Sequence, residues 1–146
     1  MRKGILAIIV LMFVSSVAYT ADWKYFGTNN DDSVYSYDGQ SLTRGKDTVK
    51  VWSRVVPGEK GKAKIVRINP EVSGIENVSY ALTLWEIDCS KKMSRTVAIR
   101  YYTSKEDVLW SDDFPDTDFE QIPPDTIISS LLEAICEKGE KPTPEK

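Results

Sequence analysis

Few residues in the chain have the types and spacing that catalysis requires. The sequence contains no histidine, so the usual general base at neutral pH is missing. The best serine motif, Val72-Ser73-Gly74, is only a fragment of a nucleophile elbow, and no glycine-rich phosphate loop is present. We therefore predict that the protein is not an enzyme and that it uses no cofactor.

The acidic segment Asp116-x-Asp118-x-Glu120 is the closest approach to a metal site. Carboxylates at alternating positions resemble the start of a calcium loop. Gln121 stands where such a loop needs glycine, however, and Ile127 stands where it needs the final glutamate. A zinc site is not indicated either, because the chain has neither histidine nor a CxxC pair. We expect a solvated acidic loop and no metal, with calcium as the alternative.

Two cysteines, Cys89 and Cys136, offer a different chemistry. In an exported protein, thiols are normally oxidised, and two cysteines allow only one internal pairing. The alternative of a free thiol pair lacks a supporting motif. We predict a Cys89–Cys136 disulfide, which stabilises the fold by about 4 kcal/mol in the chain-entropy model.

The N-terminus has the layout of an exported protein. Arg2 and Lys3 precede an uninterrupted apolar run over residues 5–14, and small residues follow up to Ala18. This order is the secretory pattern, whereas a membrane-spanning anchor needs about 20 apolar residues. We predict a signal peptide over residues 1–18, cleaved near Ala18, and no membrane span in the mature chain. The protein is then extracytoplasmic, in the periplasm, at the cell surface or in the medium.

The charge distribution excludes a general nucleic-acid binder. The chain has 19 Lys and Arg against 22 Asp and Glu, and signal cleavage removes two of the basic residues. Basic residues gather between Arg44 and Arg67, and acidic residues gather from Glu106 onward. Such an asymmetry can orient a partner. The candidate binding residues are four cations and one aromatic residue, namely Lys60, Lys62, Lys64, Arg67 and Trp52.

Most of the predicted single domain, residues 19–138, has the pattern of β-strands. Alternation is clearest around Val49, Val51 and Val55, which share one face of a strand. No helix separates successive strands, which favours antiparallel pairing over a parallel sheet. The predicted strands cover residues 23–28, 33–38, 48–56, 78–89, 96–103 and 108–111.

Two segments depart from the strand pattern. Segment 59–77 is basic and contains Asn69-Pro70 and Ser73-Gly74, so we predict a long exposed loop with at most a short strand at 63–68. After Pro124 the apolar residues recur at helical spacing. We predict a helix there with Asp125 as its N-cap, stopped by Gly139, and a disordered tail at 139–146. Its apolar stripe consists of Ile127, Ile128, Leu131, Leu132, Ile135 and Cys136.

These elements predict an α+β fold, in which an antiparallel sheet of about six strands packs one face against a C-terminal helix tethered by the disulfide. If Cys89 faces the helix, Trp85 faces it too, and Leu84 points to the reverse face. Trp52 joins the reverse face if the valines of its own strand lie under the helix. One helix cannot cover both sides, so the reverse face needs the 59–77 loop, a partner or a second copy of the chain.

A series of short aromatic and polar motifs runs through the domain. They are Trp23, Tyr35-Ser36-Tyr37-Asp38-x-x-Ser41-Leu42-x-Arg44, Val49-Lys50-Val51-Trp52, Trp85-x-x-Asp88-Cys89, Ile122-Pro123-Pro124-Asp125-Thr126 and residues 131–136. In this order the motifs resemble the surface-adhesin protein E family of bacterial envelope proteins. The resemblance implies antiparallel strands and a disulfide-tethered C-terminal helix, and the family's named member binds host proteins such as vitronectin, laminin and plasminogen. The family's named member is lipid-anchored, whereas no cysteine lies near the predicted cleavage site here.

We therefore expect an exported, non-catalytic binding module of a bacterial envelope that resembles a surface adhesin for host or matrix proteins. The alternative is a periplasmic structural or stress protein that binds another envelope component. In both cases the partner is a protein or an extracellular matrix component, and a homodimer is a further arrangement. Neither nucleic acid nor a cofactor is expected.

Overall fold

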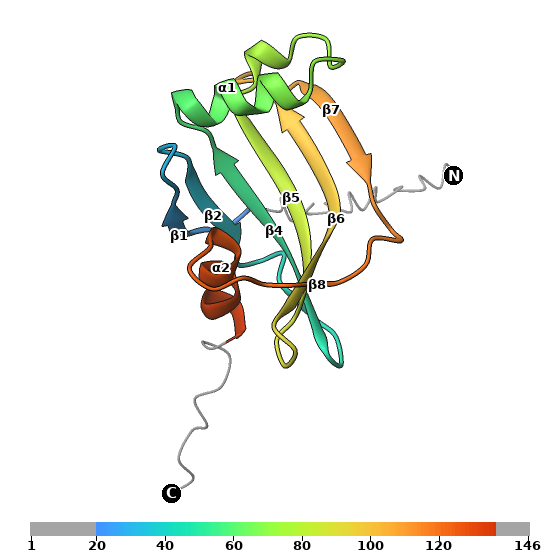
Figure 1. The fold of residues 1–146 in the computed structure, drawn as a ribbon. Helices are drawn as coiled ribbons and strands as arrows, with labels where there is room; N and C mark the ends of the chain where they lie inside the picture. The colour runs from blue at the N-terminus through green and yellow to red at the C-terminus, as the bar shows by residue number, and fades with distance from the viewer. Residues whose placement is uncertain (1–19, 137–146) are drawn as a thin grey trace, which may run out of the picture.

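The computed structural model describes residues 20–136, which form one antiparallel sheet with two helices on the same side (Figure 1). The predicted signal peptide and the predicted tail lie outside the described residues. The long strands follow one another in the order β1-β2-β4-β5-β6-β7, while short β3 pairs with β4 and short β8 pairs with β6. The elements are β1 (Trp23–Thr28), β2 (Val34–Asp38), β3 (Thr43–Arg44), β4 (Thr48–Val56), α1 (Glu59–Ile68), the 3₁₀ turn η1 (Ile75–Asn77), β5 (Tyr80–Asp88), β6 (Met93–Tyr102), β7 (Val108–Asp113), β8 (Glu120–Gln121) and α2 (Ile127–Cys136).

The predicted α+β fold and its six strands are confirmed. Strand β6 begins at Met93 and β7 extends to Asp113, so both are longer than the alternation of side chains indicated. The sequence did not predict β3 and β8, because two residues are too few to show an alternating pattern.

The register of β4 against β5 decides which side chains meet the helices. Val51 of β4 lies opposite Trp85, and Val49 lies opposite Ile87. Val51 and Ile87 are fully buried in one core cluster with Leu131 of α2. We call this side of the sheet the helix face. The other side, the open face, carries the alternate side chains of β4, namely Lys50, Trp52, Arg54 and Val56.

Helix α2 forms where the apolar stripe predicted it, with Leu131 and Ile135 buried against the sheet. Its N-cap is Thr126 and not Asp125, which adopts a left-handed backbone conformation with φ 56°. Thr126 Oγ1 accepts a hydrogen bond from the Ser129 backbone N–H, and Ser129 Oγ accepts one from the Thr126 N–H. This reciprocal pair is a capping box, built with serine in place of the usual Glu or Gln.

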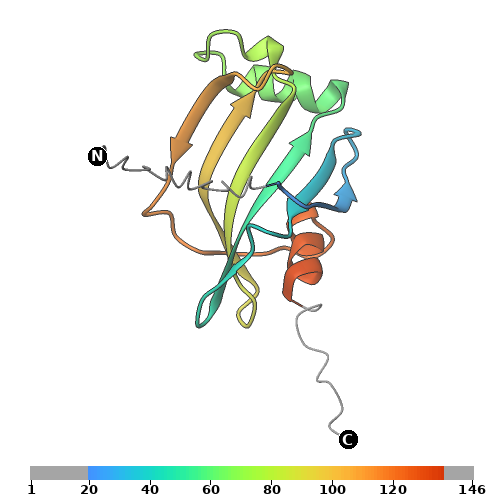
Figure 2. The ribbon, with the colours of Figure 1, turned by 180° about the vertical axis from the view of Figure 1, so that it is seen from behind.

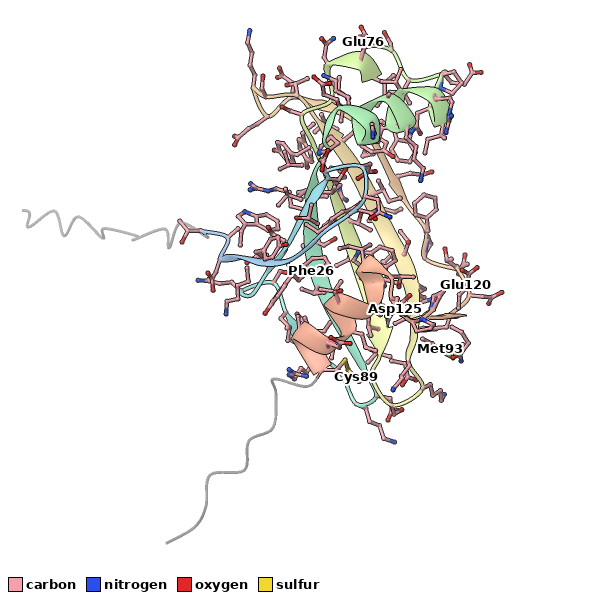
Figure 3. All side chains as sticks on the ribbon, turned by 60° about the vertical axis from the view of Figure 1, so that its left-hand side comes forward. Phe26, Glu76, Cys89, Met93, Glu120 and Asp125 are labelled. Atoms are coloured by element: carbon pink, nitrogen blue, oxygen red, sulfur yellow. A yellow bond between two sulfur atoms is a disulfide. The ribbon has the colours of Figure 1, made fainter. Side chains whose placement is uncertain are left out.

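The predicted disulfide is confirmed. Cys89 and Cys136 are bonded across 47 positions of sequence. Cys89 directly follows β5, and Cys136 is the last residue of α2. Figure 3 shows the bond at the C-terminal end of α2, on the side that faces the sheet. The bond therefore holds the last turn of α2 against the end of a central strand.

Segment 59–77 is neither the exposed loop nor the short strand that the sequence predicted. It contains α1 and η1, and α1 lies across the end of the sheet far from the disulfide (Figure 1). Ile65 and Val66 of α1 pack with buried Ile75 and with Ala81 of β5, on the helix face. The prediction of a loop rested on the basic composition and on Asn69-Pro70 and Ser73-Gly74, which lie after the end of α1 and do not interrupt it. Within residues 20–136, no helix is long and apolar enough to cross a membrane.

Gly61 is needed because α1 approaches the turn between β1 and β2 closely. A Cβ atom at this position would collide with Ser33 Oγ and lie 3.2 Å from Asp31 Oδ2. Ser33 is itself buried, at 2% exposure, so it has little room to move. The glycine thus marks a close packing contact inside a helix.

We expect Gly61→Ala to lower the free energy of unfolding by about 1–3 kcal/mol, the usual cost of overpacking, as measured by urea denaturation. Helix propensity alone would predict that the same substitution raises the free energy of unfolding by about 1 kcal/mol. Ala63→Gly, at an exposed position of the same helix, is the matched control and should cost about 1 kcal/mol through propensity only. A Gly61→Ala protein more stable than the wild type would contradict the close packing of α1.

Removing the disulfide in the Cys89→Ser/Cys136→Ser double variant should lower the free energy of unfolding by about 4 kcal/mol, because the unfolded chain is no longer constrained. The measurement is urea denaturation with and without reductant. Reductant should destabilise the wild type and leave the double variant unchanged. Equal stability of the two proteins under oxidising conditions would show that the docking of α2 does not depend on the bond.

Candidate functional site

The open face is a broad surface that neither α1 nor α2 covers (Figure 2). Several of its aliphatic side chains are exposed: Val34 to 41%, Val56 to 42% and Val108 to 56%. Val34 lies opposite Val56 in the sheet, and Val108 lies opposite Tyr102. These residues form a row across the end of the sheet. An apolar row of this kind on an uncovered sheet indicates a contact surface.

Arg54 lies in the middle of the open face between two aromatic rings. Its guanidinium carbon is 4.9 Å from the centroid of the Trp23 ring and 6.0 Å from that of the Tyr80 ring, within the range of cation–π attraction. Among residues 20–136, no carboxylate pairs with Arg54, and its solvent-shielded Nε has no hydrogen-bond partner. The side chain is only half-buried, so part of this positioned donor group stays accessible.

A second arginine repeats the arrangement two strands away. Arg54 lies opposite Leu82 of β5, which lies opposite Arg100 of β6. The Arg100 guanidinium carbon is 4.9 Å from the centroid of the Trp52 ring. Unlike Arg54, Arg100 has an acidic partner, because its Nη2 is 3.2 Å from Asp113 Oδ1. The open face therefore carries two arginines stacked on rings, of which one is already neutralised.

Tyr80 and Tyr102 form the aromatic part of the open face nearest to α1. Their rings are stacked, with centroids 4.9 Å apart and planes 7° apart. Burial raises the pKa of the Tyr80 hydroxyl, and the nearby Glu106 carboxylate raises it further. The phenol is therefore neutral at physiological pH and can both donate and accept a hydrogen bond.

A buried carboxylate, Glu86, lies on the open face at the end of the sheet away from α1. Glu86, 8% exposed, accepts hydrogen bonds from Arg95 Nε at 2.8 Å and from Thr48 Oγ1 at 2.9 Å. Burial by itself would raise the pKa of Glu86, but these bonds outweigh it and hold the pKa below its usual value. The ionised carboxylate thereby ties β4, β5 and β6 together and keeps the floor of the open face rigid.

The candidate binding residues from the sequence fall on two separate surfaces. Trp52 lies on the open face beneath Arg100. The four basic residues lie on α1, which packs on the helix face, on the opposite side of the sheet from Trp52. Lys60, Lys64 and Arg67 are exposed, and Lys62 is half-buried. The structure therefore does not combine Trp52 with the basic cluster. The acidic segment is exposed, and no group of three or more Cys, Asp or Glu within residues 20–136 is placed to hold a metal ion.

Sequence reasoning missed Arg54, Trp23 and Tyr80 as members of one site. The alternation along β4 already placed Arg54 on the same side as Trp52. It did not show that Trp23 of β1 and Tyr80 of β5 would meet Arg54 from opposite sides. That knowledge requires the order and register of strands, which a single sequence does not reveal.

Comparison with known proteins identifies the family and supports the fold. The family model described as surface-adhesin protein E matches residues 23–137. One solved structure of Haemophilus influenzae protein E has a TM-score of 0.52 and 12% identity, over 84% of this chain and 92% of that chain. A second crystal form has a TM-score of 0.51 and 14% identity, over 78% of this chain and 87% of that chain. No curated protein sequence matches the chain.

At such low identity the solved structures show a shared fold alone, so the family assignment depends on the family model. That model begins at the first residue of β1 and extends through α2. It therefore spans the open face, both helices and the disulfide. The chain belongs to the surface-adhesin protein E family.

Proposed function

We propose that this protein is a non-catalytic, extracytoplasmic binding module that acts as a surface adhesin for a host or matrix protein, and that the open face is its binding surface. Membership of the surface-adhesin protein E family supports adhesion and a position outside the cytoplasm. Family membership also favours a binding role over catalysis. The class of bound protein and the surface that binds it are the new parts of this proposal.

The observation that carries the proposal is Arg54 held between Trp23 and Tyr80 on an uncovered face. Trp, Tyr and Arg are the residues most enriched among the hot spots of protein interfaces. Rigid rings lose little conformational entropy when a partner docks, and Arg54 is already fixed by stacking. Because Nε is shielded from solvent, a partner carboxylate or carbonyl would reach the Nη groups of Arg54, for which no carboxylate within residues 20–136 competes.

The contacts that the aromatic rings of the open face already make indicate the type of partner. Trp23 and Trp52 each face a guanidinium, and Tyr80 and Tyr102 face each other, so these faces are occupied and less suited to stacking on sugar rings. The aliphatic row at Val34, Val56 and Val108 needs apolar side chains as neighbours. A protein surface supplies both apolar side chains and carboxylates, as interface cores commonly do.

The basic residues on α1 have a different role in this proposal. Lys60, Lys64 and Arg67 are exposed, so salt screens them and each contributes little to affinity. Exposed cations outside the contact surface chiefly raise the rate of association with an acidic partner. They therefore steer a partner toward the protein, and the open face retains it.

The test is surface plasmon resonance of the exported chain over immobilised laminin, vitronectin and plasminogen. For whichever protein is retained, Arg54→Ala should weaken binding by about 2 kcal/mol or more, the usual cost of truncating a hot spot, mainly through faster dissociation. Arg54→Lys should also lose affinity, since lysine keeps the charge but lacks the planar group that stacks on Trp23. The matched control, Arg67→Ala on α1, should alter the association rate and its salt dependence only.

Two outcomes would contradict parts of the proposal. If none of the three proteins is retained even at low ionic strength, the adhesin function fails. If one is retained and Arg54→Ala binds as well as the wild type, the adhesin function stands and the open face is not the surface used. Thermal unfolding of each variant, unchanged from the wild type, ensures that lost binding is not lost folding.

A further inference from the structure

The two helices leave the middle of the helix face uncovered. The buried core is divided into two clusters, one between α2 and the sheet and the other between α1, η1 and the sheet. Val55, Thr83 and Ile99 lie in the centre of the sheet, on the helix face, yet they are only half-buried. Apolar surface at the centre of a sheet, between two covering helices, is the floor of a groove.

Two cavities make up this groove. The larger, about 200 Å³, lies beside α1, and the smaller, about 50 Å³, lies beside α2. Tyr35, Val55 and Thr83 line both cavities, so the two lie next to each other along the sheet. The volume is below the 300–1,000 Å³ typical of pockets for drug-sized ligands. The groove therefore suits a slender ligand and not a bulky one.

The groove is mostly apolar beside α2 and mixed polar and apolar beside α1, and α2 forms one of its ends. Ile65 and Ile68 of α1 form one wall, and Ile128 and Leu131 of α2 form the wall at the far end. The floor belongs to the central strands β4, β5 and β6, which are paired with neighbours on both sides. A peptide laid in the groove would find few backbone partners there, and unpaired amide groups are costly to bury. A hydrocarbon chain incurs no such cost.

The mouth of the groove beside α1 carries one cation and one carboxylate, Lys64 and Asp31. Lys64 lines the larger cavity, and Lys60 and Arg67 lie on the same side of α1 at helical spacing. One acidic residue, Asp31, shares the mouth; its hydrogen bonds from Ser33 hold its pKa below the usual value, so it stays ionised. Helix α1 as a whole carries four cations against Glu59, so an excess of positive charge lies next to the mouth even though Asp31 offsets Lys64 within it.

We propose that the groove binds a free single-chain fatty acid or a similar aliphatic carboxylate. The hydrocarbon chain lies over Val55 and Thr83 toward α2, and the carboxylate lies near Lys64. Each methylene moved from water into such a groove contributes about 0.8 kcal/mol, and the charge of Lys64 selects the anionic head group. This site lies on the opposite side of the sheet from the open face and does not depend on the adhesin proposal.

Titration of the exported chain with sodium decanoate, below its micelle concentration and followed by ¹⁵N NMR and calorimetry, tests the site. We expect saturable shifts of the Val55, Thr83 and Ile99 amides. Decyltrimethylammonium, with the same chain length and a cationic head, should bind at least about tenfold more weakly. Lys64→Gln should weaken decanoate binding by about two- to fivefold and leave the cationic probe unaffected. Lys62→Gln, away from the groove, is the matched control.

Thr83→Phe should fill the floor of the groove and weaken decanoate binding by more than about tenfold. Ile68→Gln changes a 59% exposed position on the rim. It tests the wall of the groove without disturbing the core, and it should also weaken decanoate binding. Arg54→Ala should bind decanoate as the wild type does.

The proposal is overturned by an absence of saturable shifts, by shifts confined to the open face, or by equal affinity for both head groups. Binding to anionic phospholipid vesicles without binding to free decanoate would also overturn it, because the ligand would then be a membrane surface.

Discussion

The antiparallel register between β4 and β5 is the constraint on which the rest of the molecule depends. Because Val51 lies opposite Trp85 and Val49 opposite Ile87, the apolar side chains of both strands gather on one face. A slip of one residue in either strand would move its whole apolar set to the other side. The same register places Arg54 opposite Leu82, and so determines the open face. The Glu86 hydrogen bonds and the Cys89–Cys136 bond both act at the far end of this strand pair and help to hold it.

The placement of both helices on one face has two structural consequences. Within residues 20–136, neither helix covers the aromatic, aliphatic and arginine side chains of the open face, which is unfavourable in water unless a partner covers them for part of the time. The helix face receives two separate covers that do not meet, so apolar surface around Thr83 remains between them. One arrangement of helices therefore produces a broad surface on one side of the sheet and a narrow groove on the other.

How far the sequence predicts this protein depends on the range of the interactions involved. Strand positions and α2 could be predicted because alternation and helical periodicity are local. Which side of the sheet holds Trp52 followed from the same local rule. The helix α1 was missed because the turn residues Asn69-Pro70 and Ser73-Gly74 were taken to describe the whole segment 59–77, although they lie after the end of α1. Gly61, inside this helix, is explained only by its contact with Ser33, which is distant in sequence. Predicting the Arg54 cluster and the groove likewise requires the order of the strands and the placement of the helices. The spacing of residues along one chain reveals neither.

The edges of the sheet explain why a partner would meet the open face rather than extend the sheet by adding a strand. Edge strand β7 carries Asp112 and Asp113 in exposed positions, and charges on an edge oppose pairing with another strand. The opposite edge strand, β1, has an irregular register between Tyr25 and Gly27, and a bulge likewise disfavours continued pairing. Addition of a strand is thus disfavoured at both edges, which supports the proposed binding through the side chains of the open face. That surface is fixed by stacking and ion pairing before a partner arrives, so little ordering cost opposes binding.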